Sequence, residues 1–180
     1  MQKLSHSEIL EKRHSVEEMH SVSRFPFCVL LNNIRSMHNV GSIFRTADAA
    51  CIEKVYICGY TACPPREEIE KTALGSTRTV PWHYFKNGAE CIQFLKSKGY
   101  TIIALEHTDS SINIYRHKLN LDMRICVILG NEVFGIDSDL LDLADYSVEI
   151  PMYGMKHSLN VAVAFGISVY QFIQQYESAI

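Results

Sequence analysis

The chain has 180 residues, 47% of them apolar, and its formal net charge at pH 7 is −3. These values predict one globular domain that can form a hydrophobic core without disulfides or a structural metal ion, and they exclude a disordered chain. The acidic balance also excludes a uniformly basic nucleic-acid binder, so a nucleic-acid function would require a local basic patch. No apolar run reaches the ~18 residues of a membrane span and the first residues are polar, so neither a membrane span nor a signal peptide is expected.

The six cysteines form no C-x-x-C pair, and most of them lie inside apolar runs. Buried, reduced thiols in a cytoplasmic protein are the simplest interpretation, with zinc binding and disulfides as the alternatives. The histidines show no paired spacing on one element, so we expect no metal site.

The first 24 residues are polar with few apolar positions. Ile9, Val16 and Met19 are spaced so that they can line one face of a helix. We therefore expect an N-terminal helical extension over residues 1–24 and a main domain over residues 25–180.

Short apolar runs alternate with amphipathic segments through the rest of the chain. The predicted strands and extended segments are 25–31, 54–58, 79–84, 100–105, 124–129 and 146–150, with a short strand or turn inside 110–121. The predicted helices are one capped by Asn39 and starting near Val40, 69–74, one capped by Asn87, a short one capped by Asp137 or Ser138, and 158–176.

Strands that are continuous apolar runs and alternate with helices predict an α/β fold with a mostly parallel sheet flanked by helices. No linker, repeat or low-complexity segment divides the chain. The helix over 158–176 is apolar nearly all round in its first half, which indicates a place in the core or at a subunit interface. For a domain of this size we expect a homodimer.

Three segments have the form strand, short polar loop and helix: residues 32–47, 129–137 and 149–164. Open α/β proteins bind ligands outside the carboxyl ends of their strands, so we expect these loops to build one site. The G-x-G-x-x-G and G-K-[ST] signatures are absent, which excludes the usual NAD and ATP loops. The loops share small residues, amides and carboxylates, which suit the binding of adenine and ribose.

These segments closely resemble the three motifs of the SpoU/TrmH branch of the SPOUT methyltransferases. Residues 33–47 (NIRSMHNVGSIFRTA) resemble motif one, and residues 127–136 (VILGNEVFGI) resemble motif two. Residues 150–154 (IPMYG) and 158–164 (SLNVAVA) resemble motif three. The resemblance covers nearly the whole chain, and three motifs in the right order are a specific signal.

The resemblance implies a SPOUT methyltransferase domain over residues 25–180 with a C-terminal deep trefoil knot, an exception to the rule that chains avoid knots. It implies that the knot binds S-adenosyl-L-methionine and that a homodimer builds the active site from both subunits. The implied activity is methylation of a ribose 2′-hydroxyl of tRNA or rRNA in the cytoplasm, with no metal and no membrane involved.

The resemblance also implies catalytic roles. Arg45 matches the family's catalytic arginine, and because a guanidinium stays protonated we expect it to orient the ribose and stabilise the developing alkoxide. The alternative is a solvated arginine or a pair with Asp48. Asn39 matches the motif-one asparagine; the alternative is a helix cap alone, and the two roles are compatible. Glu132 matches the motif-two glutamate and is expected to fix Arg45 or the loop, the alternative being a solvated carboxylate.

Motif three supplies the remaining implied site residues. Ser158 and Asn160 are expected to shape the loop near the methyl donor and acceptor, although Ser158 alternatively caps the last helix. The implied cofactor contacts are the backbone positions Gly130, Ile150 and Leu159, together with Met152 on the adenine side and Leu129. Simple core packing is the alternative for Ile150 and Leu159.

Six basic or titratable residues near these loops are expected to contact RNA phosphates, the alternative being scattered surface charge. They are Arg35, His38, Lys71, Arg78, Lys156 and His157. The two histidines also have a pKa suited to proton transfer near neutrality, but histidine does not define the family there.

Two other functions stay open. One is a non-catalytic knotted module that binds RNA or the cofactor, against which the joint presence of the matched catalytic residues argues. The other is a methyltransferase acting on a small molecule, which the net acidity favours. Salt-dependent binding of tRNA separates the RNA enzyme from the small-molecule enzyme.

Overall fold

A seven-stranded sheet forms the centre of the chain in the computed structural model, which describes residues 1–11, 13–120, 122 and 124–178. The strand order is β3-β2-β1-β6-β4-β7-β5, and every pair of neighbours is parallel. The strands are β1 (Phe25–Asn32), β2 (Ile52–Cys58), β3 (Trp82–Phe85), β4 (Tyr100–Leu105), β5 (Ile112–Asn113), β6 (Arg124–Leu129) and β7 (Tyr146–Glu149).

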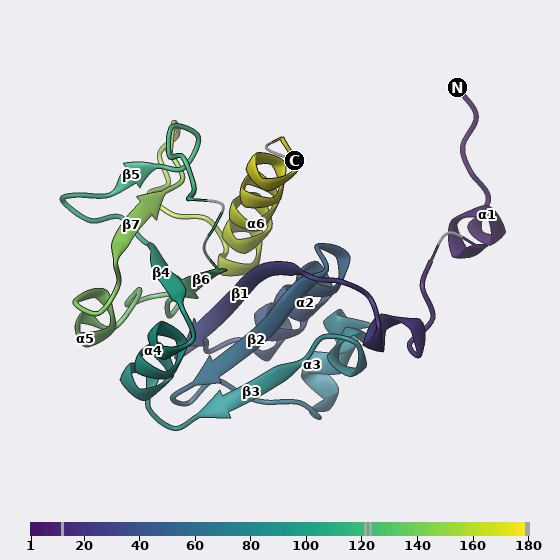
Figure 1. Ribbon diagram of the computed structural model, residues 1–180, viewed down its shortest axis with the longest axis horizontal. Helices are drawn as coiled ribbons and strands as arrows, with labels where there is room; N and C mark the ends of the chain where they lie inside the picture. The colour runs from purple at the N-terminus through teal and green to yellow at the C-terminus, as the bar shows by residue number, and fades with distance from the viewer. Residues whose placement is uncertain (12, 121, 123, 179–180) are drawn as a thin grey trace.

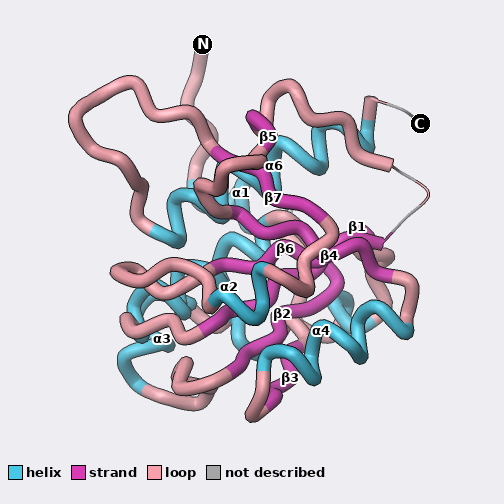
Figure 2. The backbone as a smooth tube through the Cα atoms, turned by 90° about the vertical axis from the view of Figure 1, so that its left-hand side faces the viewer, coloured by secondary structure: helices cyan, strands magenta, loops and turns pink. Residues whose placement is uncertain are grey.

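Helices cover both faces of this sheet, as the two perpendicular views in Figures 1 and 2 show, so the predicted α/β architecture is confirmed. The α-helices are α1 (His6–Glu11), α2 (Met37–Ala49), α3 (Glu67–Ala73), α4 (Gly88–Ser97), α5 (Ser138–Leu141) and α6 (Val161–Glu177), and two 3₁₀ turns are η1 (Glu18–His20) and η2 (Ser76–Arg78).

Residues 25–31 of strand β1 are a continuous apolar run because both faces of the strand are buried. Val29 and Leu31 belong to the core under α2, α3 and α6, whereas Cys28 and Leu30 belong to the core under α4 and α5. Successive side chains of a strand point to opposite faces, so a strand covered on both faces must be apolar at every position.

The predicted start of α2 was wrong, because Ser36 and not Asn39 caps the helix. The Ser36 Oγ accepts a hydrogen bond from the Asn39 backbone N–H at 3.3 Å, and the helix begins at Met37. A residue in the first turn has its side chain free for contacts outside the helix, so the shift leaves the Asn39 amide available to the site.

Helix α6 also begins later than predicted. Asn160 is its cap: the Asn160 Oδ1 accepts hydrogen bonds from the backbone N–H groups of Ala162 at 2.9 Å and Val163 at 3.4 Å. Ser158 therefore lies in the loop before the helix and does not cap it. The loop between β7 and α6 is longer than the sequence suggested, and most of its residues are exposed.

The N-terminal segment does not form the single helical face that its apolar spacing predicted. Ile9 lies in α1, which has no buried residue and stands away from the sheet, whereas Met19 lies in η1 and is buried. Arg24 fixes this segment to the domain. Its guanidinium donates hydrogen bonds to the carbonyl oxygens of Met19 at 3.2 Å, Ile52 at 3.2 Å and Thr79 at 2.7 Å.

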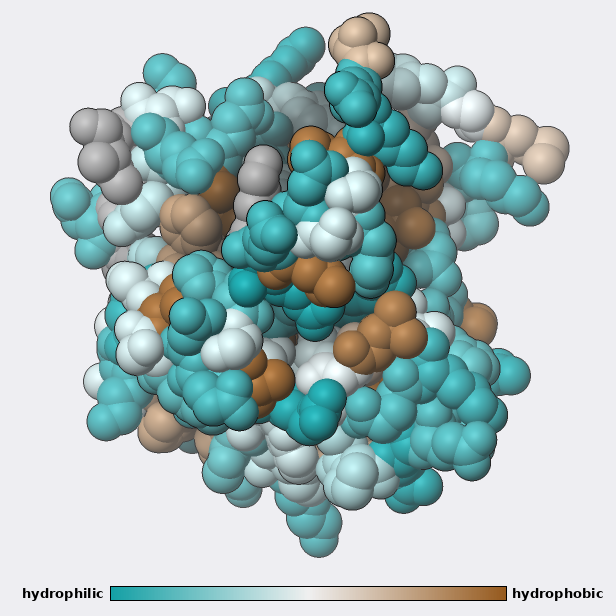
Figure 3. Space-filling model, turned by 90° about the vertical axis from the view of Figure 1, so that its right-hand side faces the viewer, coloured by the Kyte–Doolittle hydropathy of each residue, from teal (hydrophilic) through white to brown (hydrophobic). Residues whose placement is uncertain are grey.

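The surface drawn in Figure 3 is mainly hydrophilic, with small separate hydrophobic patches. Within the described part of the chain, no helix is both long enough and apolar enough to cross a membrane. All six cysteines are free thiols, and Cys28, Cys58, Cys91 and Cys126 are buried.

Candidate active site

A cavity of about 570 Å³ lies at the carboxyl ends of β4, β6 and β7. Because neighbouring strands are parallel, the loops that follow them meet at one edge of the sheet, where open α/β folds bind ligands. All five residues predicted to bind a cofactor line this cavity: Leu129, Gly130, Ile150, Met152 and Leu159. Its volume falls within the range of small-molecule sites, ~300–1,000 Å³.

A chain of side-chain hydrogen bonds joins the three predicted motifs beside the cavity. The Asn39 Nδ2 donates to Glu132 Oε1 at 2.8 Å, and the Asn160 Nδ2 donates to Asn39 Oδ1 at 3.0 Å. Glu132 and Asn160 also belong to the cavity lining. Residues from three distant parts of the sequence are therefore held in one fixed arrangement, which we call the motif relay: Glu132, Asn39 and Asn160.

Glu132 holds the motif-one loop and does not hold Arg45. Its carboxylate accepts hydrogen bonds from the backbone N–H groups of Arg35 at 2.9 Å and Ser36 at 3.0 Å, besides that from Asn39. Partial burial raises the pKa of Glu132, but the hydrogen bonds outweigh this effect and the pKa lies below its ordinary value. The carboxylate is thus ionised at neutral pH.

Arg45 lies on α2 with an exposed side chain and does not line the cavity. Among the described residues its guanidinium makes neither a hydrogen bond nor an ion pair, and the alternative partner Asp48 instead accepts a hydrogen bond from Thr79 at 2.5 Å. Five donors on this guanidinium are therefore available to a molecule from outside the chain.

The turn after β6 is braced from inside the protein. The Asn131 Oδ1 accepts hydrogen bonds from the backbone N–H groups of Val133 at 2.8 Å and Phe134 at 3.0 Å. Asn131 and Gly135 exchange a pair of backbone hydrogen bonds, each 2.9 Å long. A Cβ atom at Gly130 would lie 2.2 Å from the Gly135 carbonyl carbon, so only glycine lets the turn close over itself.

Asp137 supports the same edge of the sheet and does not cap α5 with its side chain. Its Oδ2 accepts hydrogen bonds from Asn32 Nδ2 at 3.0 Å and Asn33 Nδ2 at 2.7 Å. Asn131 completes this support, because its Nδ2 donates to the Asn33 carbonyl oxygen at 2.9 Å. The motif-one and motif-two loops are thus joined by these hydrogen bonds as well as by the motif relay.

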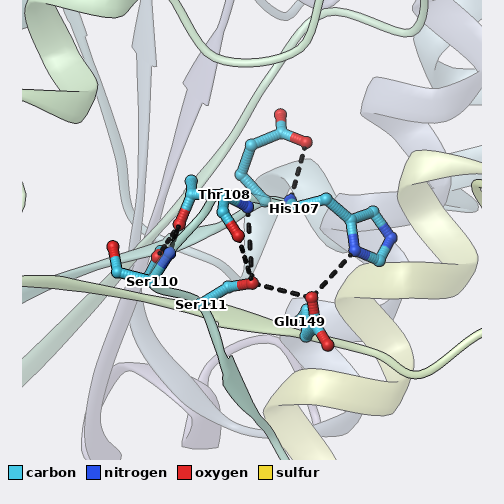
Figure 4. A network of polar contacts seen from close by, with 7 residues as sticks. His107, Thr108, Ser110, Ser111 and Glu149 are labelled. Atoms are coloured by element: carbon cyan, nitrogen blue, oxygen red, sulfur yellow. Dashed lines mark hydrogen bonds and ion pairs between the residues drawn. The ribbon is translucent and has the colours of Figure 1, made fainter.

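A second polar network, which the sequence analysis missed, forms another wall of the cavity (Figure 4). His107 Nδ1 lies 3.1 Å from Glu149 Oε2, and Ser111 Oγ donates to the same oxygen at 2.7 Å. These hydrogen bonds, led by that from Ser111, lower the pKa of Glu149. The signal in the sequence was a polar Glu106-His107 pair directly after an apolar strand, at a carboxyl end.

Glu106 connects this wall to the turn after β6. Its Oε2 accepts a hydrogen bond from the Ile136 backbone N–H at 3.1 Å, and its Oε1 accepts one from the His107 N–H at 3.0 Å. Within the described residues, no group of three histidine, cysteine, aspartate or glutamate side chains is arranged to hold a metal ion.

Comparison with known proteins identifies the family of this chain. The sequence model of the SpoU rRNA Methylase family matches residues 26–170. The chain belongs to this family.

Curated SpoU-family relatives are RNA methyltransferases by name. A tRNA (guanosine(18)-2′-O)-methyltransferase of Aquifex aeolicus (strain VF5) is 30% identical over 171 residues, which are 94% of this chain and 79% of the relative. A 23S rRNA (guanosine-2′-O-)-methyltransferase RlmB of Shewanella oneidensis is 28% identical over 92% of this chain and 66% of the relative. The chain is thus shorter than either relative.

Solved structures of SpoU proteins share the fold. The A. aeolicus TrmH/SpoU tRNA modifying enzyme gives a TM-score of 0.79 at 29% identity, covering 95% of this chain and 86% of that chain. An AdoMet-bound rRNA methyltransferase from Sinorhizobium meliloti gives 0.77 at 26% identity, covering 87% of this chain but only 59% of that chain.

The SpoU-family chain brings together only some of the predicted site residues. Glu132, Asn160, Ser158 and the five cofactor positions line the cavity, and Asn39 is joined to the first two by hydrogen bonds without lining it. Arg45 neither lines the cavity nor belongs to this hydrogen-bonded group. Lys71 forms an ion pair with Glu67 at 3.0 Å. All six residues predicted to contact RNA are exposed, and of these only His157 lines the cavity; the others are Arg35, His38, Lys71, Arg78 and Lys156.

Proposed function

We propose that this chain transfers a methyl group from S-adenosyl-L-methionine to a ribose 2′-hydroxyl of tRNA or rRNA, in the cytoplasm. The observation that carries the proposal is the motif relay, in which Glu132, Asn39 and Asn160 connect the three motif loops beside a cofactor-sized cavity. The named activities of the tRNA and rRNA relatives support the same reaction class.

The composition of the cavity wall fits the cofactor. Leu129, Ile150 and Leu159 offer apolar surface to an adenine ring, and Glu106 and Glu149 offer negative charge to a sulfonium or ammonium group. The described residues that line the cavity include no lysine or arginine. When bound, S-adenosylmethionine supplies an activated methyl group and so carries the hard part of the chemistry.

The protein's own task is to orient the acceptor ribose and to exclude water. We assign the orientation to Arg45, whose guanidinium stabilises the developing alkoxide and hydrogen-bonds the neighbouring phosphate. Since Arg45 does not line the cavity of its own chain, we infer that a homodimer completes the site. Helix α6 supports this inference with exposed apolar side chains at Val163 and Tyr170.

RNA binding in this proposal rests on phosphate contacts. The net charge of −3 means that these contacts must come from a local group of cations rather than from the whole surface. Among the six residues predicted to contact RNA, Lys156 and His157 are nearest in sequence to the motif-three residues Ser158 and Asn160, and both lie on the exposed loop before α6. The trefoil knot through this loop stays a prediction of the family resemblance.

The experiment that tests the proposal uses the purified chain with total tRNA, and separately total rRNA, from cells that lack its gene. Methyl-labelled S-adenosylmethionine reports transfer, and mapping of alkali-resistant positions identifies the methylated ribose. We expect label in one of the two RNA pools and one mapped site. Cofactor binding without transfer would favour the non-catalytic module, and no RNA binding at low salt would favour a small-molecule substrate.

A further inference from the structure

Phe134 is an aromatic side chain at the cavity that no folding role explains. Its side chain is 85% exposed, yet it belongs to the lining of the cavity together with Leu159 and Asn160. Leaving a phenyl ring in water forfeits the free energy that burial would give. An exposed aromatic ring beside a polar site is typical of a residue that packs against a ligand.

The backbone that carries Phe134 is fixed, so the ring is presented to the cavity and not merely left on a loose loop. The Asn131 Oδ1 accepts the Phe134 N–H at 3.0 Å, and the paired backbone bonds between Asn131 and Gly135 close the turn. Asn131 is itself buried, and its Nδ2 donates to the Tyr60 hydroxyl at 2.7 Å. This bracing makes Phe134 a ready-positioned contact.

We propose that Phe134 stacks on the base of the nucleotide whose ribose is methylated, an inference that rests on the proposed function. A ribose that enters the cavity mouth draws its base out of the RNA stack, and that base needs a new stacking surface. Aromatic side chains provide such a surface for any base, because every base has a π-face. The enzyme thus holds its acceptor nucleotide by the base as well as by the ribose and phosphate.

A second copy of the chain is the competing occupant of this ring, and the geometry favours the base. Phe134 shares the cavity lining with Asn160, a member of the motif relay, so a protein segment packed on the ring would obstruct the acceptor's way to the relay. Val163 and Tyr170, the exposed apolar residues of α6 that suit a subunit contact, are both outside that lining.

The first test compares substitutions at Phe134 on the RNA pool that the wild type methylates. We expect Phe134→Ala and Phe134→Leu to lower kcat/KM roughly tenfold, because loss of one stacked base costs about that factor, and Phe134→Trp to retain activity. Tyr115→Ala is the matched control and should retain wild-type activity, since Tyr115 is also an exposed aromatic residue, at 53%, but does not line the cavity. The affinity for S-adenosylmethionine and the oligomeric state are expected to stay unchanged.

The second test is a double-mutant cycle between the ring and the base. An RNA with an abasic ribose at the mapped position should lose about tenfold in kcat/KM with the wild type and almost nothing further with Phe134→Ala. Independent losses that multiply would overturn the stacking, as would wild-type rates for Phe134→Ala. A dissociated Phe134→Ala oligomer would assign the ring to the second copy. If the wild type itself methylates neither RNA pool, the proposed function fails instead.

Discussion

Asn160 donates a hydrogen bond to Asn39, with 3.0 Å between Nδ2 and Oδ1, across 121 positions of sequence. The other atom of the same amide, Oδ1, caps α6 by accepting the N–H groups of Ala162 and Val163. One side chain therefore stabilises a helix end and also connects motif three to motif one. The two roles use different atoms, so they can be separated by substitution.

Replacing Asn160 with aspartate should retain the cap and break the link to Asn39. Aspartate is a good cap, so the melting temperature of Asn160→Asp should stay within about 2 °C of the wild type. A carboxylate cannot donate a hydrogen bond to Asn39. The rate of methyl transfer should therefore fall by roughly tenfold or more, because a displaced loop misaligns the acceptor ribose. Calorimetry and single-turnover methylation measure the two effects.

Asn160→Ala is the matched comparison, since it removes both roles. It should lose the same activity and also about 1 kcal/mol of stability, which lowers the melting temperature of a chain of this size by about 2–4 °C. Full methylation activity in Asn160→Asp would contradict the role assigned to the motif relay.

The stabilising effect of Glu132 should depend on its charge and hence on pH. Hydrogen bonds hold its pKa below the ordinary value of 4.5, so the ionised form stabilises the fold above that pH. The contribution is lost as the pH falls through the lower, folded-state pKa. Glu132→Gln should therefore melt a few degrees below the wild type near neutrality, and the difference should shrink below pH 4.5.

Melting curves of both proteins between about pH 3 and pH 8 measure this difference. Other titrating groups are common to both proteins and cancel in the comparison. We expect about 1 kcal/mol near neutrality, a small value because Glu132 is largely exposed and water screens its charge. A difference that is constant over the whole pH range would mean that shape and not ionisation explains the effect.

The strands of the sheet could be predicted from the sequence, because burial on both faces requires apolar residues at successive positions. Residues 100–105 and 124–129 are apolar except at Thr101 and Arg124, and both runs form strands with the predicted bounds. The helix starts at Met37 and Val161 were missed for a local reason. Several polar residues precede each helix, and the sequence does not indicate which of them accepts the first free N–H groups.

The site was only partly readable, because motif resemblance identifies residues but not their partners. Glu132 was expected to fix either Arg45 or the loop, and only the folded chain shows the three donors that converge on its carboxylate. The wall made by His107 and Glu149 joins two strands far apart in sequence. Such long-range pairs depend on the strand order, which local patterns do not specify.

Gly130 should be intolerant of a single added methyl group. A Cβ atom there would meet the Gly135 carbonyl carbon and the Ile136 nitrogen at 2.2 Å, and neither backbone atom can move without opening the turn. We expect Gly130→Ala to lose about 1–3 kcal/mol of stability and to weaken binding of S-adenosylmethionine. Gly154→Ala is the control, because a Cβ atom there meets nothing within 4 Å.

Thermal melts and titration calorimetry with S-adenosylmethionine measure both glycine variants. Gly154→Ala should stay within about 0.5 kcal/mol of the wild type, as is usual for a substitution at an exposed position without contacts. If Gly130→Ala retains wild-type stability and cofactor affinity, the closed turn after β6 is not required for the cavity.

Arg45 should be needed for methyl transfer but not for folding. Its side chain is exposed and makes no hydrogen bond or ion pair with the described residues, so Arg45→Ala should melt with the wild type and bind S-adenosylmethionine equally well. Its methylation rate should fall by roughly 100-fold, the usual loss when a donor to a developing oxyanion is removed. Arg116→Ala, at another exposed arginine, controls for loss of charge.

Arg45→Lys tests why an arginine is needed. Lysine keeps the charge but lacks the planar fork that binds a ribose oxygen and a phosphate together, so its rate should stay at least about tenfold below the wild type.

Mixing Arg45→Ala with a cofactor-site variant such as Gly130→Ala tests the homodimer in the same assay. Partial recovery of activity in the mixture is expected if the site draws on both subunits, and a full rate for Arg45→Lys would refute the fork geometry.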